Sequence, residues 1–139
     1  MISALVDLLG ASYAAGDFIG LEVIASSMLA TIPDDLVGLL FLGLALHFTG
    51  RSKEARNVFR RTGSIDFEAL DQAGKQIVEP ANAATYREAI RPGARLANGW
   101  LQIAQLLGSY GFARQAEGAL RSWRFTQRPI DRRSLPSLS

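Results

Sequence analysis

Cysteine is absent from the sequence, and histidine occurs once, at position 47. Without cysteine the chain can form no disulfide, no thiolate metal site and no thiol nucleophile. His47 has no acidic residue near it at helical spacing, which favours a structural or groove-lining role over a catalytic one. No glycine-rich phosphate loop follows a predicted strand, and Asp34 and Asp35 are better explained as helix caps than as metal ligands. We therefore expect no enzyme activity, no metal and no cofactor.

Positive charge is missing from the first 50 residues, which carry five acidic residues and no Lys or Arg. Residues 51–139 carry all fifteen bases against the remaining eight of the thirteen acids, so a block of −5 precedes a block of +7. A chance distribution over a solvated surface would give this pattern. A charge-polarised body that steers an acidic or dipolar partner would give it too.

Apolar runs long enough to cross a bilayer are also missing. Residues 36–48, LVGLLFLGLALHF, form a charge-free stretch that predicts a helix of about 20 Å, too short to span a membrane. This helix is apolar on all sides, so neighbouring helices or a partner must bury it. The N-terminus lacks the basic start of a signal peptide, and we expect a cytoplasmic location.

A spacing of 34 residues separates Gly16 from Gly50, and each glycine lies between two predicted helices. The units around them share a large residue, a large–small pair, another large residue, a turn glycine and a small residue where two helices cross. In the second unit these residues are Leu39, Leu42, Gly43, Leu46, Gly50 and Ala55, and Phe59 follows one turn later. Such a helix hairpin cannot bury its own apolar face and has to stack on a neighbour.

This pattern resembles the tetratricopeptide repeat. The resemblance implies an all-α fold, a right-handed α-α superhelix of stacked helix hairpins with about eight helices. The repeat units are placed at 2–35, 36–69 and 97–125, and 70–96 is either a shortened, degenerate unit or a helical insertion without repeat ancestry. Residues 126–139, rich in Arg, Ser and Pro, are expected to form a flexible tail or linker after the domain of residues 1–125. The predicted helices are 3–15, 17–30, 35–49, 52–62, 66–78, 83–91, 95–108 and 112–125, with Asn82 as an N-cap.

The resemblance also implies that residues of the first helix of each unit line a concave groove that binds a partner. The residues placed there are Val6, Tyr13, Leu40, Leu44, His47, Phe48 and Leu101. The basic clamp by which chaperone-binding members hold a terminal carboxylate is missing at the matching positions Val6, Gly10, Phe41, Asn98 and Gln102. An apolar groove wall could take a partner helix or peptide, meet a second copy, or be covered by residues 66–96 as core.

Basic residues gather in the second half of the chain, at Lys53, Arg56, Arg60, Arg61, Arg121, Arg124 and Arg128. Trp123 and Phe125 lie among them, and bases interleaved with aromatic residues can bind single-stranded nucleic acid. A solvated outer face is the alternative. Only two of the fifteen bases are lysine, and because arginine pairs well with carboxylates, a protein partner fits this composition equally.

Together these features predict a non-catalytic protein–protein interaction scaffold that holds a partner segment or a second copy of itself. Small bacterial proteins of similar appearance include secretion-system chaperones, and this resemblance of type is compatible with a chaperone or adaptor role. Two alternatives stay open: a nucleic-acid-binding module that uses the Arg-rich half, and a docking domain of a larger enzyme with the tail as its linker.

Overall fold

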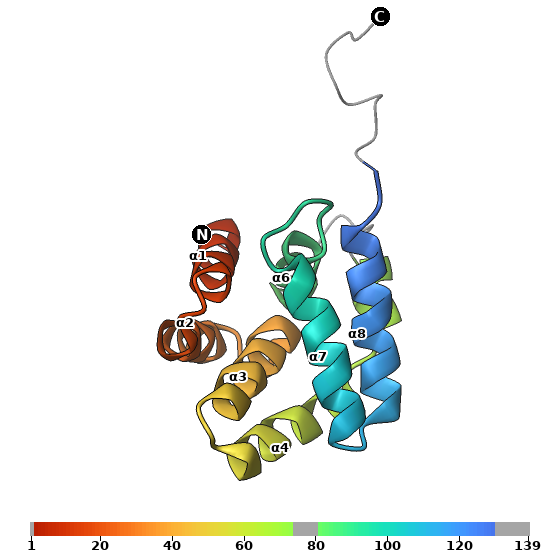
Figure 1. The fold of residues 1–139 in the computed structure, drawn as a ribbon. Helices are drawn as coiled ribbons and strands as arrows, with labels where there is room; N and C mark the ends of the chain where they lie inside the picture. Colours follow the sequence, from red (N-terminus) through yellow and green to blue (C-terminus); the bar gives the residue numbers. More distant parts are fainter. Residues whose placement is uncertain (1, 74–80, 130–139) are drawn as a thin grey trace, which may run out of the picture.

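The computed structural model describes residues 2–73 and 81–129, and all regular structure in those residues is helical (Figure 1). This confirms the predicted all-α class. The helices are α1 (Ile2–Ala14), α2 (Phe18–Thr31), α3 (Leu36–Phe48), α4 (Ser52–Arg61), α5 (Phe67–Ala73), α6 (Ala81–Ala89), α7 (Ala97–Ser109) and α8 (Ala113–Thr126), with a 3-10 turn, η1, at Thr62–Ser64.

The predicted helix ends agree with these bounds to within two residues, apart from the fifth helix, whose predicted end at 74–78 lies outside the described residues. Two local predictions are wrong. Asn82 does not cap a helix, because α6 already begins at Ala81. Thr126, which the sequence placed in the tail, is buried in the last turn of α8, and its carbonyl accepts a hydrogen bond from the Gly93 amide at 3.4 Å.

Glycine determines the turn of three helix hairpins, α1–α2, α3–α4 and α7–α8. Gly16, Gly50 and Gly111 have φ angles of 69°, 82° and 87°, a region that residues with a Cβ rarely adopt. Within the second hairpin, a Cβ on Gly43 would lie 2.3 Å from a ring carbon of Phe59, and Ala55 is fully buried. The predicted close crossing of these two helices is therefore present in the structure.

The apolar helix α3 lies at the centre of the molecule, in contact with α2, α4, α6 and α7 (Figure 1). Asp35 caps its N-terminus by accepting a hydrogen bond from the Gly38 amide at 2.9 Å. From Leu36 to Leu46 every residue except Leu42 is buried. The prediction that this stretch must be covered on several sides is confirmed, and the cover is supplied by the chain itself.

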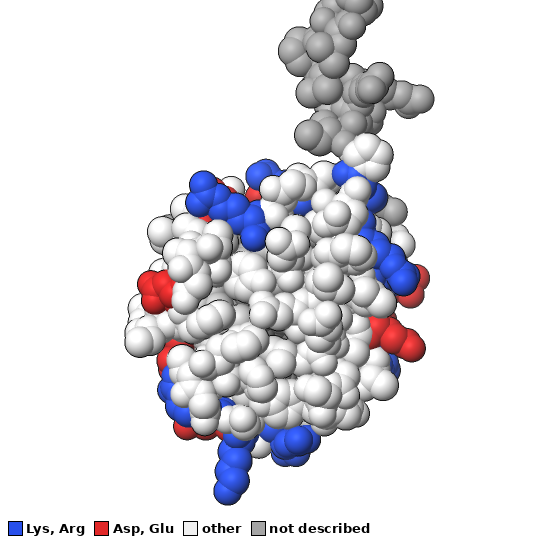
Figure 2. All heavy atoms as spheres, viewed as in Figure 1, with Lys and Arg blue, Asp and Glu red and all other residues white. Residues whose placement is uncertain are grey.

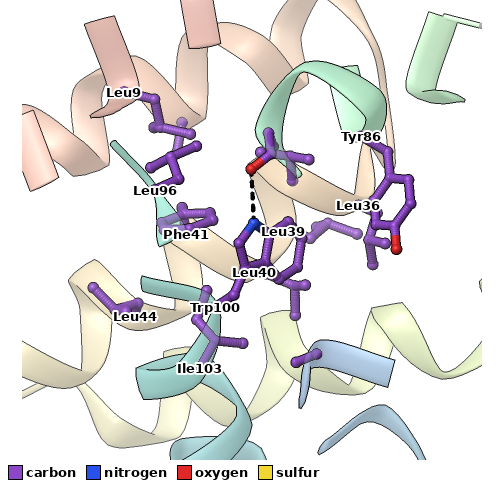
Figure 3. Packing of buried hydrophobic residues seen from close by; sticks show 14 of the residues in the cluster. Leu9, Leu36, Leu39, Leu40, Phe41, Leu44, Tyr86, Leu96, Trp100 and Ile103 are labelled. Atoms are coloured by element: carbon purple, nitrogen blue, oxygen red, sulfur yellow. Dashed lines mark hydrogen bonds between the residues drawn. The ribbon is translucent and has the colours of Figure 1, made fainter. Parts of the chain in front are cut away.

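Large aromatic side chains join the C-terminal helices to α3 (Figure 3). The Phe41 ring packs edge-on against Tyr13 of α1 and Trp100 of α7, with ring centroids 6.0 and 5.8 Å apart. The Trp100 indole N–H donates to the Ala89 carbonyl at 3.0 Å, so its one polar group is satisfied inside the core. These contacts hold α6 and α7 against the side of α3 that the sequence analysis assigned to a groove, with cover by residues 66–96 as one of its alternatives.

Candidate protein-interaction surface

The predicted groove is mostly core. Leu40 and Leu44 have no exposed surface, and Val6 is only 6% exposed. In Figure 3, Leu40 and Leu44 lie on α3 among Trp100 and Ile103 of α7. The assignment of these three residues to a partner-binding groove is therefore corrected, because helices from the second half of the chain pack over this face.

Tyr13 and His47, two further predicted groove residues, are half-buried and hydrogen-bonded within the chain. The Tyr13 hydroxyl donates to Oε1 of Gln102 in α7 at 2.6 Å, and burial raises the pKa of that phenol. Nδ1 of His47 and the Tyr110 hydroxyl lie 2.9 Å apart and share a hydrogen bond. Both side chains tie α1 and α3 to α7 and the turn after it, which agrees with the structural role favoured for the only histidine.

Phe48 and Leu101, the remaining predicted groove residues, contribute to apolar surface. Phe48 is 42% exposed at the end of α3, where its ring stacks on Phe18 at a centroid distance of 4.9 Å. Leu101 lines a shallow depression of about 270 Å³ between α7 and α8. We call this depression the α7–α8 groove; its lining residues are Leu101, Ala104, Gln105, Ala116, Glu117 and Leu120.

A second apolar surface, on α2, was missed by the sequence analysis. Ile19 is 71% and Val23 is 58% exposed, and they lie one turn apart. The exposed residues of the same stripe are uncharged; we call this stripe the α2 face, formed by Ile19, Val23, Ser26, Ser27 and Ala30. The Ser27 hydroxyl already donates to the Val23 carbonyl at 3.0 Å, so this donor is satisfied within the helix.

The absence of charged residues from the α2 face is unusual for a helix that covers the core with one side only. Exposed helix faces in globular proteins normally carry polar and charged residues. The single charged residue of α2, Glu22, is paired with Arg51, whose Nη1 lies 3.0 Å from Oε2 of Glu22; this pairing lowers the pKa of the carboxyl group. The sequence signal does not mark the exposed side, because residues 18–31 contain one charge and show no amphipathic pattern.

Figure 2 shows a broad uncharged area over the face on which α3 and α7 lie in Figure 1. The sequence explains it, because neither α3 nor α7 contains an acidic residue, a lysine or an arginine. Lys and Arg atoms lie along the lower edge of this face, near α4, and along its upper edge. The charges thus surround an uncharged area, an arrangement typical of protein–protein interfaces.

The predicted basic surface is divided between two places, and many of its members have partners inside the chain. On α4, Arg56 lies 5.0 Å from the centre of the Tyr110 ring and donates to the Tyr110 carbonyl at 3.1 Å. Arg61 forms an ion pair with Asp34 at 2.6 Å, and Arg60 donates to Oδ1 of Asn57 at 3.4 Å. Lys53 is exposed and has no ion-pair partner among the described residues.

On α8 the arginines contact acids of α5 and the aromatic residue that lies among them in the sequence. Arg121 lies 3.9 Å from Glu68 and 4.0 Å from Asp71. Arg121 and Arg128 lie over the Phe125 ring, at 5.4 and 4.4 Å from its centre, so this ring is already occupied by arginine. Arg124 is exposed, and within the described ranges it forms no ion pair.

Among the described residues one carboxylate, that of Asp35, is fully buried. Asp35, the cap of α3, also accepts a short hydrogen bond from the Thr85 hydroxyl of α6. Desolvation raises the pKa of Asp35, while the hydrogen bonds from Thr85 and from the backbone oppose that rise. Asp35 therefore joins α3 to α6. In residues 2–73 and 81–129 no three His, Cys, Asp or Glu side chains come together as metal ligands would.

Comparisons with protein families, with curated proteins and with solved structures found no match for this chain. In the part of the chain that the structure describes, no helix has the length and apolar character needed to cross a membrane. The α2 face and the α7–α8 groove are apolar surfaces of the described residues, and Leu8 of α1 and Phe48 of α3 are further exposed apolar side chains.

Proposed function

We propose that this protein is a non-catalytic scaffold of tetratricopeptide-like helix hairpins that binds another protein through the α2 face. The observation that carries the proposal is the exposure of Ile19 and Val23 on a helix stripe without charge. Covering these two side chains would contribute on the order of 1–2 kcal/mol each to binding, in proportion to their exposed fractions. The turn glycines and the Gly43–Phe59 crossing support the relation to tetratricopeptide hairpins.

The chemistry of the α2 face favours an apolar helix or segment as the partner. The face is a straight stripe, which suits the i, i+4 side-chain spacing of a second helix. Small residues at Ser26, Ser27 and Ala30 would let a partner backbone approach closely. Shielding an apolar segment of another protein is the work of a chaperone or adaptor, and we propose this class of role.

Charged variants of the α2 face test the proposal. Ile19→Glu and Val23→Glu place a carboxylate on a surface that is already exposed, so both variants should fold with the melting temperature of the wild type. Asn57→Glu, on the exposed side of α4, adds the same charge away from the α2 face and serves as the control. Proteins that co-purify with the wild-type chain from cells of its source should be retained by the control and lost by both α2 variants. A folded Val23→Glu variant that retains every co-purifying protein would refute the proposal.

A further inference from the structure

We propose that the α2 face of one copy docks in the α7–α8 groove of a second copy, so that copies associate head to tail. This inference rests on the proposed function, because it names the occupant of the α2 face. The two surfaces complement each other in chemistry: one is a protruding stripe led by Ile19 and Val23, and the other is a shallow depression lined by Leu101, Ala104, Ala116 and Leu120. A helix laid between α7 and α8 would pack as a third helix on a hairpin.

Charge selects a head-to-tail contact over a symmetric one. Residues 2–31, which form the α1–α2 hairpin, carry Asp7, Asp17 and Glu22 and no base, a net charge of −3. Residues 97–126, which form the α7–α8 hairpin, carry Arg114, Arg121 and Arg124 against Glu117, a net charge of +2. Glu22 and Arg121 are already paired within the chain, with Arg51 and with Glu68 and Asp71. The charges outside these pairs are −2 on the first hairpin, from Asp7 and Asp17, and +1 on the second, from Arg114 and Arg124 against Glu117. Unlike hairpins therefore attract each other, and like hairpins repel.

A contact between two different surfaces of identical chains leaves one of each surface free, and it continues into a ring or an open chain. This property gives a decisive test by sedimentation velocity of the full chain. Val23→Glu should block the α2 face and Ala104→Glu should block the groove, so each variant alone should sediment as a monomer. An equimolar mixture should form a one-to-one dimer and nothing larger, because one intact surface of each kind remains.

The wild type and the Asn57→Glu control should both show a sedimentation coefficient that rises with protein concentration. Ile19→Glu and Gln105→Glu, at exposed positions of the same two surfaces, repeat the test if either first variant fails to fold. A wild type that stays monomeric, or a mixture that stays monomeric, would overturn the head-to-tail contact. If the mixture fails while the α2 variants still lose a co-purifying protein, the proposed function stands and the second copy is not its partner.

Discussion

Single glycines decide how closely the helices of this molecule approach. Gly43 faces Phe59 across the α3–α4 crossing, where an added Cβ would lie 2.3 Å from the ring, whereas a Cβ on Gly108 of α7 would meet nothing within 4 Å. Both glycines lie inside helices without positive φ. The same substitution should therefore have opposite effects at the two positions.

Gly43→Ala should lower the free energy of unfolding by about 1–3 kcal/mol, because the buried Phe59 ring has to move in a packed core. Gly108→Ala should raise it by about 0.5–1 kcal/mol, since alanine restricts the unfolded chain and favours the helix. Urea denaturation of both variants measures the two changes. A destabilising Gly108→Ala, or a neutral Gly43→Ala, would contradict the packing described for that position.

Asp35 makes stability depend on pH in a direction that follows from its burial. Its pKa is raised in the folded state, so the folded protein binds more protons than the unfolded chain between the two pKa values. The contribution of Asp35 to stability is then fully present below the unfolded pKa, which is about 3.9, and is lost as pH rises through the folded pKa.

Asp35→Asn removes this titration and keeps an oxygen that can accept from the Gly38 amide. Relative to the wild type, the variant should gain stability as pH rises through the folded pKa of Asp35. Melting temperatures of both proteins, measured from acid to neutral pH, give this difference. A relative gain that instead increases toward acid pH would mean that the ionised carboxylate is the stabilised form.

At the scale of the helix, the positions of the helices could be predicted from the sequence, whereas the sides on which they are buried could not. The helices themselves follow from local signals, namely the Asp35 cap and the glycines at 16, 50 and 111. The burial of the α3 face does not follow from local signals, because this face is covered by Trp100 and Tyr86, which belong to helices far away in the sequence. The exposure of Ile19 and Val23 could not be predicted, because α2 is apolar on both sides and lacks the amphipathic pattern that distinguishes a buried side from an exposed one.

The difference between α3 and α2 gives a prediction at this scale. Leu44→Glu would bury a carboxylate among apolar side chains and should cost about 4 kcal/mol or more, or carry a strongly raised pKa. Ile19→Glu introduces the same group on an exposed position and should leave stability nearly unchanged. Circular dichroism and thermal melting compare the two variants directly. Equal melting temperatures would contradict the burial of Leu44.

For the whole molecule, the important feature is that distant parts of the sequence complete one core. In a simple stack of repeats each unit contacts its neighbours in sequence, so parts of the array can fold alone. Here Tyr13 of α1 reaches Gln102 of α7, and His47 of α3 reaches Tyr110 after α7. The first two hairpins therefore depend on the last one for their cover.

A fragment of residues 1–64, which retains α1 to α4 and η1, should for this reason fail to fold on its own. Without α6 and α7 it would expose Leu40, Phe41 and Leu44, and the loss of their burial would cost roughly 1.5–3 kcal/mol for each side chain. The full chain should instead unfold in one transition, with helix content and tryptophan fluorescence changing at the same urea concentration. Circular dichroism of the fragment measures whether residues 1–64 fold alone. A helical fragment that melts cooperatively would show that the first two hairpins form a unit independent of the α7–α8 hairpin. In that case Leu40 and Leu44 would be accessible whenever the last hairpin detached, and the groove predicted from the sequence would be an alternative state of the same chain.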